Sequence, residues 1–108
     1  MKETLAVVDL SPSPRASSCA SLLKVLADET RLAVMEQLLA GPKHVGEINE
    51  PLAVEPSLLS HHLKVLRDAG LVCAERDGKQ VLYRLSPQVH GERQGKAINL
   101  GCCLISFD

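Results

Sequence analysis

Apolar and polar residues follow a helical period most clearly between residues 55 and 70. Glu55 stands at a capping position, and Pro56 suits the first helical position, where its missing N–H would be unpaired anyway. Gly70 can end a helix because it adopts the left-handed conformation without a Cβ penalty. The sequence therefore predicts a single helix here, and its apolar face consists of Leu59, Leu63 and Leu66.

Another face of this helix carries only polar side chains, which are Ser57, Ser60, His61 and Lys64. Short hydroxyls, an imidazole and an ammonium group can reach base edges or phosphates in a DNA major groove, which is wide enough for a helix. A merely solvated face is the alternative interpretation, because most amphipathic helices have one.

Three helices are predicted before this one. The first begins at Ser17 or Ser18 and extends to about residue 27, and Asp28 then caps a second helix that ends near Ala40. A shorter helix covers residues 44–52, and a tight connection leads from it into the helix with the polar face. Such an order of elements predicts a helix-turn-helix.

After Gly70 the period changes from 3.6 to 2, which predicts two strands at residues 71–76 and 79–85. Between them, Asp77-Gly78 is a strong signal for a two-residue hairpin turn, and the expected register pairs Arg76 with Lys79. Both cations then lie at the hairpin tip, a position suited to contact with a phosphate backbone. A solvated turn is the alternative.

The chain has 108 residues and only two aromatic ones, so we expect a single domain with an aliphatic core built mainly by helix packing. Residues 17–86 form this domain, residues 1–16 are a peripheral segment, and residues 87–108 form a tail. No apolar run approaches the roughly 18 to 20 residues that span a bilayer, and the first residues do not resemble a signal peptide. We therefore expect a cytoplasmic protein without membrane contact.

The formal net charge of −1 hides an uneven distribution. Residues 1–56 carry a net charge of −3, whereas residues 57–96, which include the two-faced helix and the hairpin, carry +3. Phosphate affinity depends on the cations that reach the backbone, so the local charge is mildly favourable for nucleic-acid binding.

Three stretches of the sequence are distinctive in combination, and they are 23–32, LKVLADETRL, 60–72, SHHLKVLRDAGLV, and 77–85, DGKQVLYRL. Through them, residues 20–86 closely resemble the arsenic-repressor (ArsR/SmtB-type) family of bacterial regulators. The resemblance implies a mainly helical, winged helix-turn-helix homodimer that represses transcription from a palindromic DNA operator and leaves it when a metal, metalloid or other thiol-directed signal binds. Carried over by position, the operator contacts are Ser57, Ser60, His61 and Lys64 in the recognition helix and Arg76 and Lys79 in the wing.

The sequence departs from two sensor patterns of this family. The helix at residues 44–52 has no Cys-x-Cys, which many arsenic sensors carry there. The zinc sensors use Asp and His ligands along a C-terminal helix, whereas this tail is interrupted by Pro87 and several glycines and offers only His90 and Glu92, so a zinc site of that type is not expected. The same breaks argue against the long C-terminal helix that usually helps to form the dimer in this family. Residues 17–27 are then expected to form most of the dimer interface.

Four cysteines remain as candidate sensor groups. Cys102 and Cys103 are adjacent soft ligands, which favour thiophilic ions, and Cys19 is the expected third donor. We expect arsenite or antimonite as the inducer and no cofactor for DNA binding, while Cys73 is interpreted as strand filler. An apolar tail, residues 100–107, that simply docks on the body is the alternative role of this segment.

Two other functions stay open. A redox- or persulfide-responsive repressor of the same fold would join Cys19 to Cys102 or Cys103, because adjacent cysteines form a disulfide only with strain. A small thiol enzyme lacks support, since no Cys-x-x-Cys accompanies a βαβ pattern. An interaction module without DNA binding is the remaining alternative.

Overall fold

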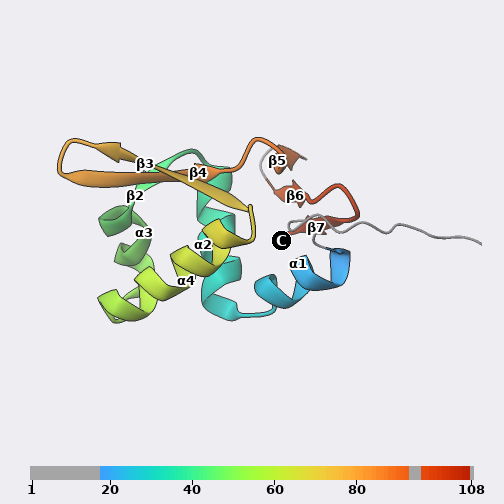
Figure 1. Cartoon of the computed structure of the whole chain (residues 1–108), viewed down its shortest axis with the longest axis horizontal. Coiled ribbons are helices and arrows are strands. Elements are labelled where there is room, and N and C mark those ends of the chain that lie inside the picture. Colours follow the sequence, from blue (N-terminus) through green and yellow to red (C-terminus); the bar gives the residue numbers. More distant parts are fainter. Residues whose placement is uncertain (1–17, 93–95, 108) are drawn as a thin grey trace, which may run out of the picture.

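The structure, a computed structural model, describes residues 18–92 and 96–107, so the predicted peripheral segment 1–16 lies outside the described residues. Four helices are followed by a β-hairpin and by a second, smaller sheet near the C-terminal end (Figure 1). No helix in the described part of the chain is long and apolar enough to cross a membrane. The helices are α1 (Cys19–Leu26), α2 (Glu29–Leu39), α3 (Val45–Leu52) and α4 (Pro56–Asp68).

Side-chain caps start the first two helices where the sequence predicts them. Ser18 Oγ accepts from the N–H of Ser21 at the start of α1, and Asp28 Oδ1 accepts from the N–H of Arg31, 3.0 Å away, at the start of α2. Each cap satisfies a backbone donor that has no partner within its own helix. The break at residues 27–28 therefore separates two helices in an otherwise continuous apolar pattern.

The turn between α3 and α4 is held by one amide side chain. Asn49 Nδ2 donates to the carbonyl of Val54 over 2.9 Å, and Asn49 Oδ1 accepts from the N–H of Val54 over 3.0 Å. Ala53, between them, adopts a left-handed conformation with φ of 51°. The short connection of the helix-turn-helix is thus held by hydrogen bonds to both backbone groups of Val54, its N–H and its carbonyl.

A single aliphatic core joins all four helices to both sheets. Its fully buried members include Met35 from α2, Ile48 from α3 and Leu66 from α4, together with Ile98 from the C-terminal sheet. The remaining buried hydrophobic members are Leu26, Val34, Leu38, Leu59, Leu63, Leu71, Val72, Tyr83 and Val89.

The wing is the hairpin of β3 (Val72–Asp77) and β4 (Gln80–Leu85), and the short strand β2 (Lys43–His44) pairs with the other side of β4. The predicted register was wrong by two residues. Arg76 pairs with Val81 rather than with Lys79, because the two-residue turn is Gly78-Lys79 rather than Asp77-Gly78. Gly78, with φ of 66°, takes the first central position of the turn, where a hairpin turn favours glycine. A shift of two residues leaves the same side chains on each face.

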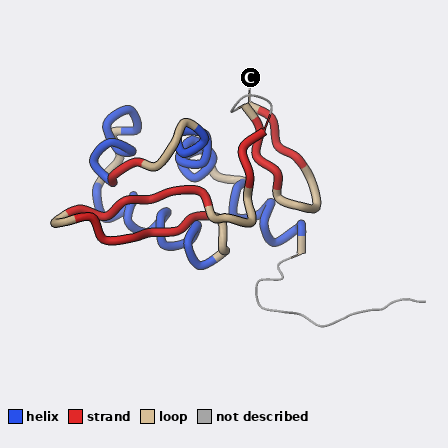
Figure 2. Tube along the Cα trace, turned by 90° about the horizontal axis from the view of Figure 1, so that it is seen from above, coloured by secondary structure: helices blue, strands red, loops and turns tan. Residues whose placement is uncertain are grey.

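The tail forms a second antiparallel sheet in the order β5 (His90–Glu92), β6 (Ala97–Asn99) and β7 (Leu104–Ser106). It lies beside α1, at the end of the molecule away from the wing tip (Figures 1 and 2). Ala97 and Ile98 are fully buried, and Leu100, Ile105 and Phe107 pack partly against the core. The described residues of the tail thus form short strands, and residues 100–107 dock on the body, as the alternative interpretation of this segment has it.

Candidate functional site

The four polar residues predicted on one face of α4 are all exposed in the structure, while Leu59, Leu63 and Leu66 on the opposite face are buried. Leu58, near the start of the helix, is 46% exposed. His62, in contrast to His61, is buried, with 7% of its surface exposed. The helix thus presents Ser57, Ser60, His61 and Lys64 outward.

Ser57 is engaged in the helix cap rather than free for a ligand. Its hydroxyl donates to Glu55 Oε1, and the same carboxylate oxygen accepts from the N–H of Ser57 and of Leu58. The Ser57 hydroxyl is the main cause that lowers the pKa of Glu55 below its usual range. A negative charge therefore stands at the N-terminus of α4, beside the residue that we expected to contact DNA.

Lys64 is also paired. Its Nζ lies 2.8 Å from Asp68 Oδ2, four residues later on the same face, and this hydrogen bond lowers the pKa of Asp68. Both side chains are well exposed, so the pair is weak and a phosphate oxygen can replace the carboxylate. Ser60 and His61 form no hydrogen bond or ion pair with a described residue, and the His61 ring lies beside that of His62, with the ring centroids 5.7 Å apart.

At the wing tip, the side chains of Arg76 and Lys79 are exposed and form no ion pair with a described residue. Asp77, the carboxylate between them, is instead bound by His44: Nε2 of the ring lies 2.7 Å from Asp77 Oδ2. Because Asp77 is held by His44 from the side of β2, the two cations at the tip are left to meet an external anion.

His44 was not predicted as a functional residue, and it ties the wing to the start of α3. Its second ring nitrogen, Nδ1, lies 3.1 Å from Glu47 Oε1, which also accepts from the His44 N–H over 2.7 Å. The hydrogen bond with Asp77 is the largest cause that raises the pKa of His44 above 6.5. A cap residue followed three positions later by Glu is a visible sequence signal for the bond to Glu47, but nothing local indicates the bond to the wing.

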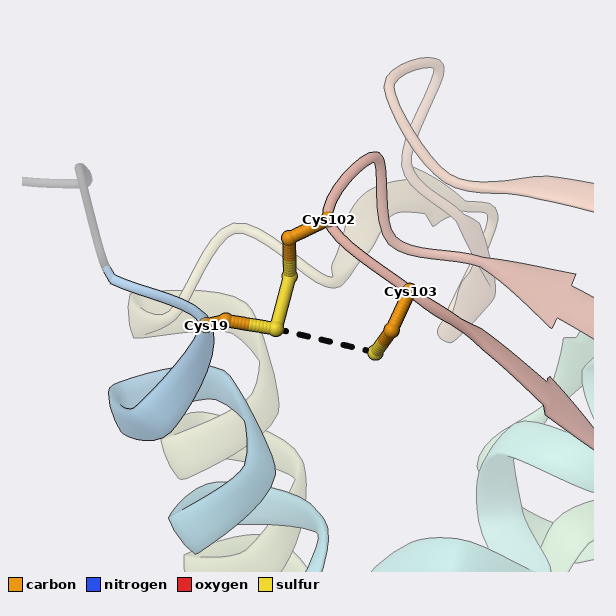
Figure 3. Close-up of side chains that lie close together, drawn as sticks. All are labelled: Cys19, Cys102 and Cys103. Atoms are coloured by element: carbon orange, nitrogen blue, oxygen red, sulfur yellow. Dashed lines mark hydrogen bonds between the residues drawn. A yellow bond between two sulfur atoms is a disulfide. The ribbon is translucent and has the colours of Figure 1, made fainter.

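The three predicted sensor cysteines are brought together at the other end of the molecule. Cys19 is the first residue of α1, and Cys102 and Cys103 lie in the turn between β6 and β7. Figure 3 shows the three side chains converging between the helix and the turn. The three Sγ atoms all lie within 4.8 Å of one another, and no other group of three His, Cys, Asp or Glu ligand atoms in the described residues is so compact.

Two sulfurs of the cluster are joined. Cys19 and Cys102 form a disulfide, with Cα atoms 5.9 Å apart, and Cys103 Sγ lies 3.7 Å from Cys19 Sγ as a free thiol. In a thiolate site with bonds of about 2.3 Å at a tetrahedral angle, two sulfurs lie about 3.8 Å apart. The Cys19 and Cys103 sulfurs are therefore already at a separation that one soft ion can bridge. When the disulfide is reduced, the donor set becomes three thiolates.

The turn that carries Cys102 and Cys103 is itself fixed by backbone bonds. The N–H of Leu100 donates to the carbonyl of Cys103 over 2.9 Å, and Gly101 takes a positive φ of 91°. Cys73, in contrast, lies half-buried on β3, opposite Arg84, and is not part of the cluster. His90 and Glu92, the two zinc ligands that the tail offers, belong to β5, but their side chains are not among the described ones.

Comparisons with known proteins agree with the architecture. The family model described as "Bacterial regulatory protein, arsR family" matches residues 28–73. The transcriptional regulator NmtR of Mycobacterium tuberculosis is 41% identical over 73 residues, which cover 68% of this chain and 61% of that protein. The chain thus spans about three fifths of the length of the curated relatives it matches.

Solved structures show the same fold. The transcriptional repressor BigR of Xylella fastidiosa superposes with a TM-score of 0.61 and 38% identity, covering 68% of this chain and 74% of that one. A Mycobacterium bovis domain, described as a homodimeric winged helix-turn-helix DNA-binding domain, gives a TM-score of 0.59 with 30% identity and 64% coverage of each chain.

The helix-turn-helix, the hairpin wing and these relatives agree with the resemblance seen in the sequence. These relatives are described as a transcriptional regulator, a transcriptional repressor and a DNA-binding domain, which agrees with the prediction of a regulator rather than an enzyme. The chain belongs to the ArsR family of bacterial regulatory proteins.

Proposed function

We propose that this protein is a DNA-binding transcriptional repressor that leaves its operator when a thiophilic metalloid binds Cys19, Cys102 and Cys103. The observation that carries the proposal is the approach of three sulfurs to within 4.8 Å in a chain that also has an exposed recognition helix. Arsenite or antimonite is the inducer that this donor set fits best, because soft sulfur ligands select soft ions over hard ones.

On the DNA side, α4 enters the major groove and the wing follows the phosphate backbone. Ser60 and His61 are free to meet base edges, and Lys64 exchanges Asp68 for a phosphate. Arg76 and Lys79 add affinity that does not depend on sequence, since each is exposed without an ion-pair partner among the described residues. BigR, a relative of the same fold, is described as a transcriptional repressor, which supports this assignment.

The repressor acts as a homodimer on a two-fold symmetric site, with half-sites about one helical turn apart. The related Mycobacterium bovis domain is described as homodimeric. Helix α1 is the element that we assign to the interface, because its Leu23 is 43% exposed although its last residue, Leu26, is buried in the core.

The DNA half of the proposal is tested by titrating the reduced protein onto the DNA that lies upstream of its own gene, at several salt concentrations. Lys64→Ala should weaken binding and lower the salt slope by about 1 for each phosphate that the lysine neutralises in the parent. Ser60→Ala and His61→Ala should weaken binding to the operator more than to unrelated duplexes. If all three variants bind and respond to salt as the parent does, α4 is not the reading helix.

The sensor half is tested by releasing the reduced protein from its operator with arsenite. Cys102→Ser and Cys103→Ser should bind the operator normally and resist release, and Cys19→Ser should show the same defect in part or in full. Cys73→Ser is the matched control, because this thiol lies outside the cluster. Release of the Cys102, Cys103 double variant at the parent's arsenite concentration would remove the metalloid site.

A second candidate function, a redox response, is favoured by one observation, the disulfide between Cys19 and Cys102. Its formation removes two of the three thiolates, so an oxidised protein cannot bind the metalloid through all three sulfurs. A parent protein that ignores arsenite but leaves the operator after mild oxidation or polysulfide treatment would establish the redox function in place of the metalloid one.

A further inference from the structure

Arg31, near the start of α2, connects three helices through one guanidinium group. Its Nε donates to the carbonyl oxygen of Val25 in α1 over 2.6 Å. Its Nη1 lies 3.0 Å from Nδ1 of His62 in α4. Because its own N–H is held by the capping carboxylate of Asp28, the side chain starts from a fixed point of the backbone.

The chemistry of the two partners defines the direction of each bond. A guanidinium is always protonated and has only donors, so Nδ1 of His62 accepts and the ring proton lies on Nε2. His62 is 7% exposed, and an unpaired nitrogen there would carry the full cost of its removal from water. Asp28 Oδ1 lies 4.0 Å from the same nitrogen, too far for a hydrogen bond. Arg31 is therefore the only described hydrogen-bond partner of this ring nitrogen.

The two partners of Arg31 lie on the helices that carry the two halves of the proposed function. Cys19 begins α1, and Val25 lies six residues later in the same eight-residue helix, so a movement of the sulfur end reaches the Val25 carbonyl through rigid hydrogen-bonded turns. His62 lies in α4 directly after His61 and two residues from both Ser60 and Lys64. One side chain thus bridges the helix of the cysteine cluster and the helix that faces DNA.

We propose that Arg31 is the positioning residue that transmits the state of the cysteine cluster to the recognition helix. This inference rests on the proposed function and names its route. When an ion or a disulfide draws Cys19 toward the turn at Cys102, α1 shifts, the Val25 carbonyl moves, and the guanidinium changes the position of His62 and hence of α4. A directional bond at each end makes the contact sensitive to small shifts, whereas the surrounding aliphatic contacts are non-directional.

The test compares operator affinity in three states of the full-length protein: reduced, reduced with arsenite, and oxidised to the Cys19–Cys102 disulfide. The measured quantity is the ratio of dissociation constants between a signalled state and the reduced state, which is about 5- to 150-fold for typical allosteric coupling. Arg31→Lys keeps the charge, but one ammonium cannot span both acceptors, so the ratio should fall at least about fivefold toward 1.

His62→Leu removes the acceptor and should lower the ratio of dissociation constants in the same way. In His62→Asn the amide oxygen can occupy the place of Nδ1, so this variant should keep most of the parent's ratio. Arg67→Lys is the matched control. Arg67 also belongs to α4, but its Nη1 lies 3.4 Å from the hydroxyl of Tyr83 in the wing and not near α1, so its ratio should equal the parent's. Thermal unfolding identifies any variant that fails to fold, and arsenite should still protect the cysteines of each folded variant from alkylation.

A parent-like ratio in both Arg31→Lys and His62→Leu would overturn the inference and leave the proposed function intact. An equal fall of the ratio in Arg31→Lys and Arg67→Lys would do the same, because it would assign the effect to any arginine of the domain. A parent whose affinity changes with neither arsenite nor oxidation would instead refute the sensor half of the proposed function, and the transmission route with it.

Discussion

The two cations at the wing tip allow a quantitative prediction for DNA binding. Arg76 and Lys79 are exposed without a described ion-pair partner, because Asp77 between them is bound by His44. Replacing both by alanine removes four phosphate contacts from a dimer. At about 0.9 units of salt slope per phosphate, the slope of log affinity against log salt should fall by about 3.6. When the salt concentration is raised from 50 to 200 mM, the ratio of the parent's DNA affinity to that of the variant should then fall about 150-fold.

The assay is fluorescence anisotropy with the operator and with an unrelated duplex of equal length. Affinity for both should fall by similar factors, since phosphate contacts carry no sequence information. Arg84→Ala is the matched control in the same hairpin, because Arg84 lies opposite Cys73 near the base of the hairpin, away from the tip, and its loss should change the slope by much less than 1 per subunit. An unchanged slope, or a weakening confined to one base position, would refute the assignment of the wing to the backbone.

Two further predictions concern stability. The pKa of His44 is raised above 6.5 by two carboxylates, so its stabilising effect is complete below the unfolded pKa and is lost as the pH rises through the folded value. Urea unfolding should therefore show that His44→Gln is destabilising near pH 5.5 and nearly neutral at about pH 9. A loss of unfolding free energy that grows as the pH rises would contradict this expectation. Ile48→Ala, at a fully buried position, should lower the free energy of unfolding by about 2 to 5 kcal/mol, and a decrease below about 1 kcal/mol would mean that the core closes around the site.

Elements with local signals were predicted well from the sequence. The caps at Ser18, Asp28 and Glu55 and the end of α4 near Gly70 agree with the structure, because each depends on contacts within a few residues. The hairpin was placed correctly, but its register was not, since Asp-Gly and Gly-Lys were both possible central pairs and Gly78 suits either position.

The tail shows the limit of local reasoning. Short strands such as β6 are stabilised by burial of Ala97 and Ile98 against the core, and no periodic pattern in three residues indicates this. The convergence of Cys19 with Cys102 depends on that docking, over 83 positions of sequence separation. Their chemistry made the pair a candidate, but only the fold shows that the sulfurs meet.

Within the candidate DNA-binding face, an ion pair inside α4 could be predicted from the spacing of its residues in the sequence alone. Lys64 and Asp68 are four residues apart, the distance at which opposite charges pair on a helix. The bond between Arg31 and His62 was not accessible, because 31 residues separate them and neither belongs to a local motif that predicts the other.

The separation of Cys19 and Cys102 also bears on how long each molecule survives in a cell. A disulfide that joins them closes a ring containing α2, α3, α4 and the wing, and such a ring restricts the unfolded chain. An ion that binds only the folded form, at 100 times its dissociation constant, adds about 2.7 kcal/mol to the free energy of unfolding. Proteases that attack the opened chain would then find it about 100-fold less often. Molecules that hold the ion should therefore outlast ion-free molecules that are not bound to DNA, and they would be available to rebind once the signal has gone.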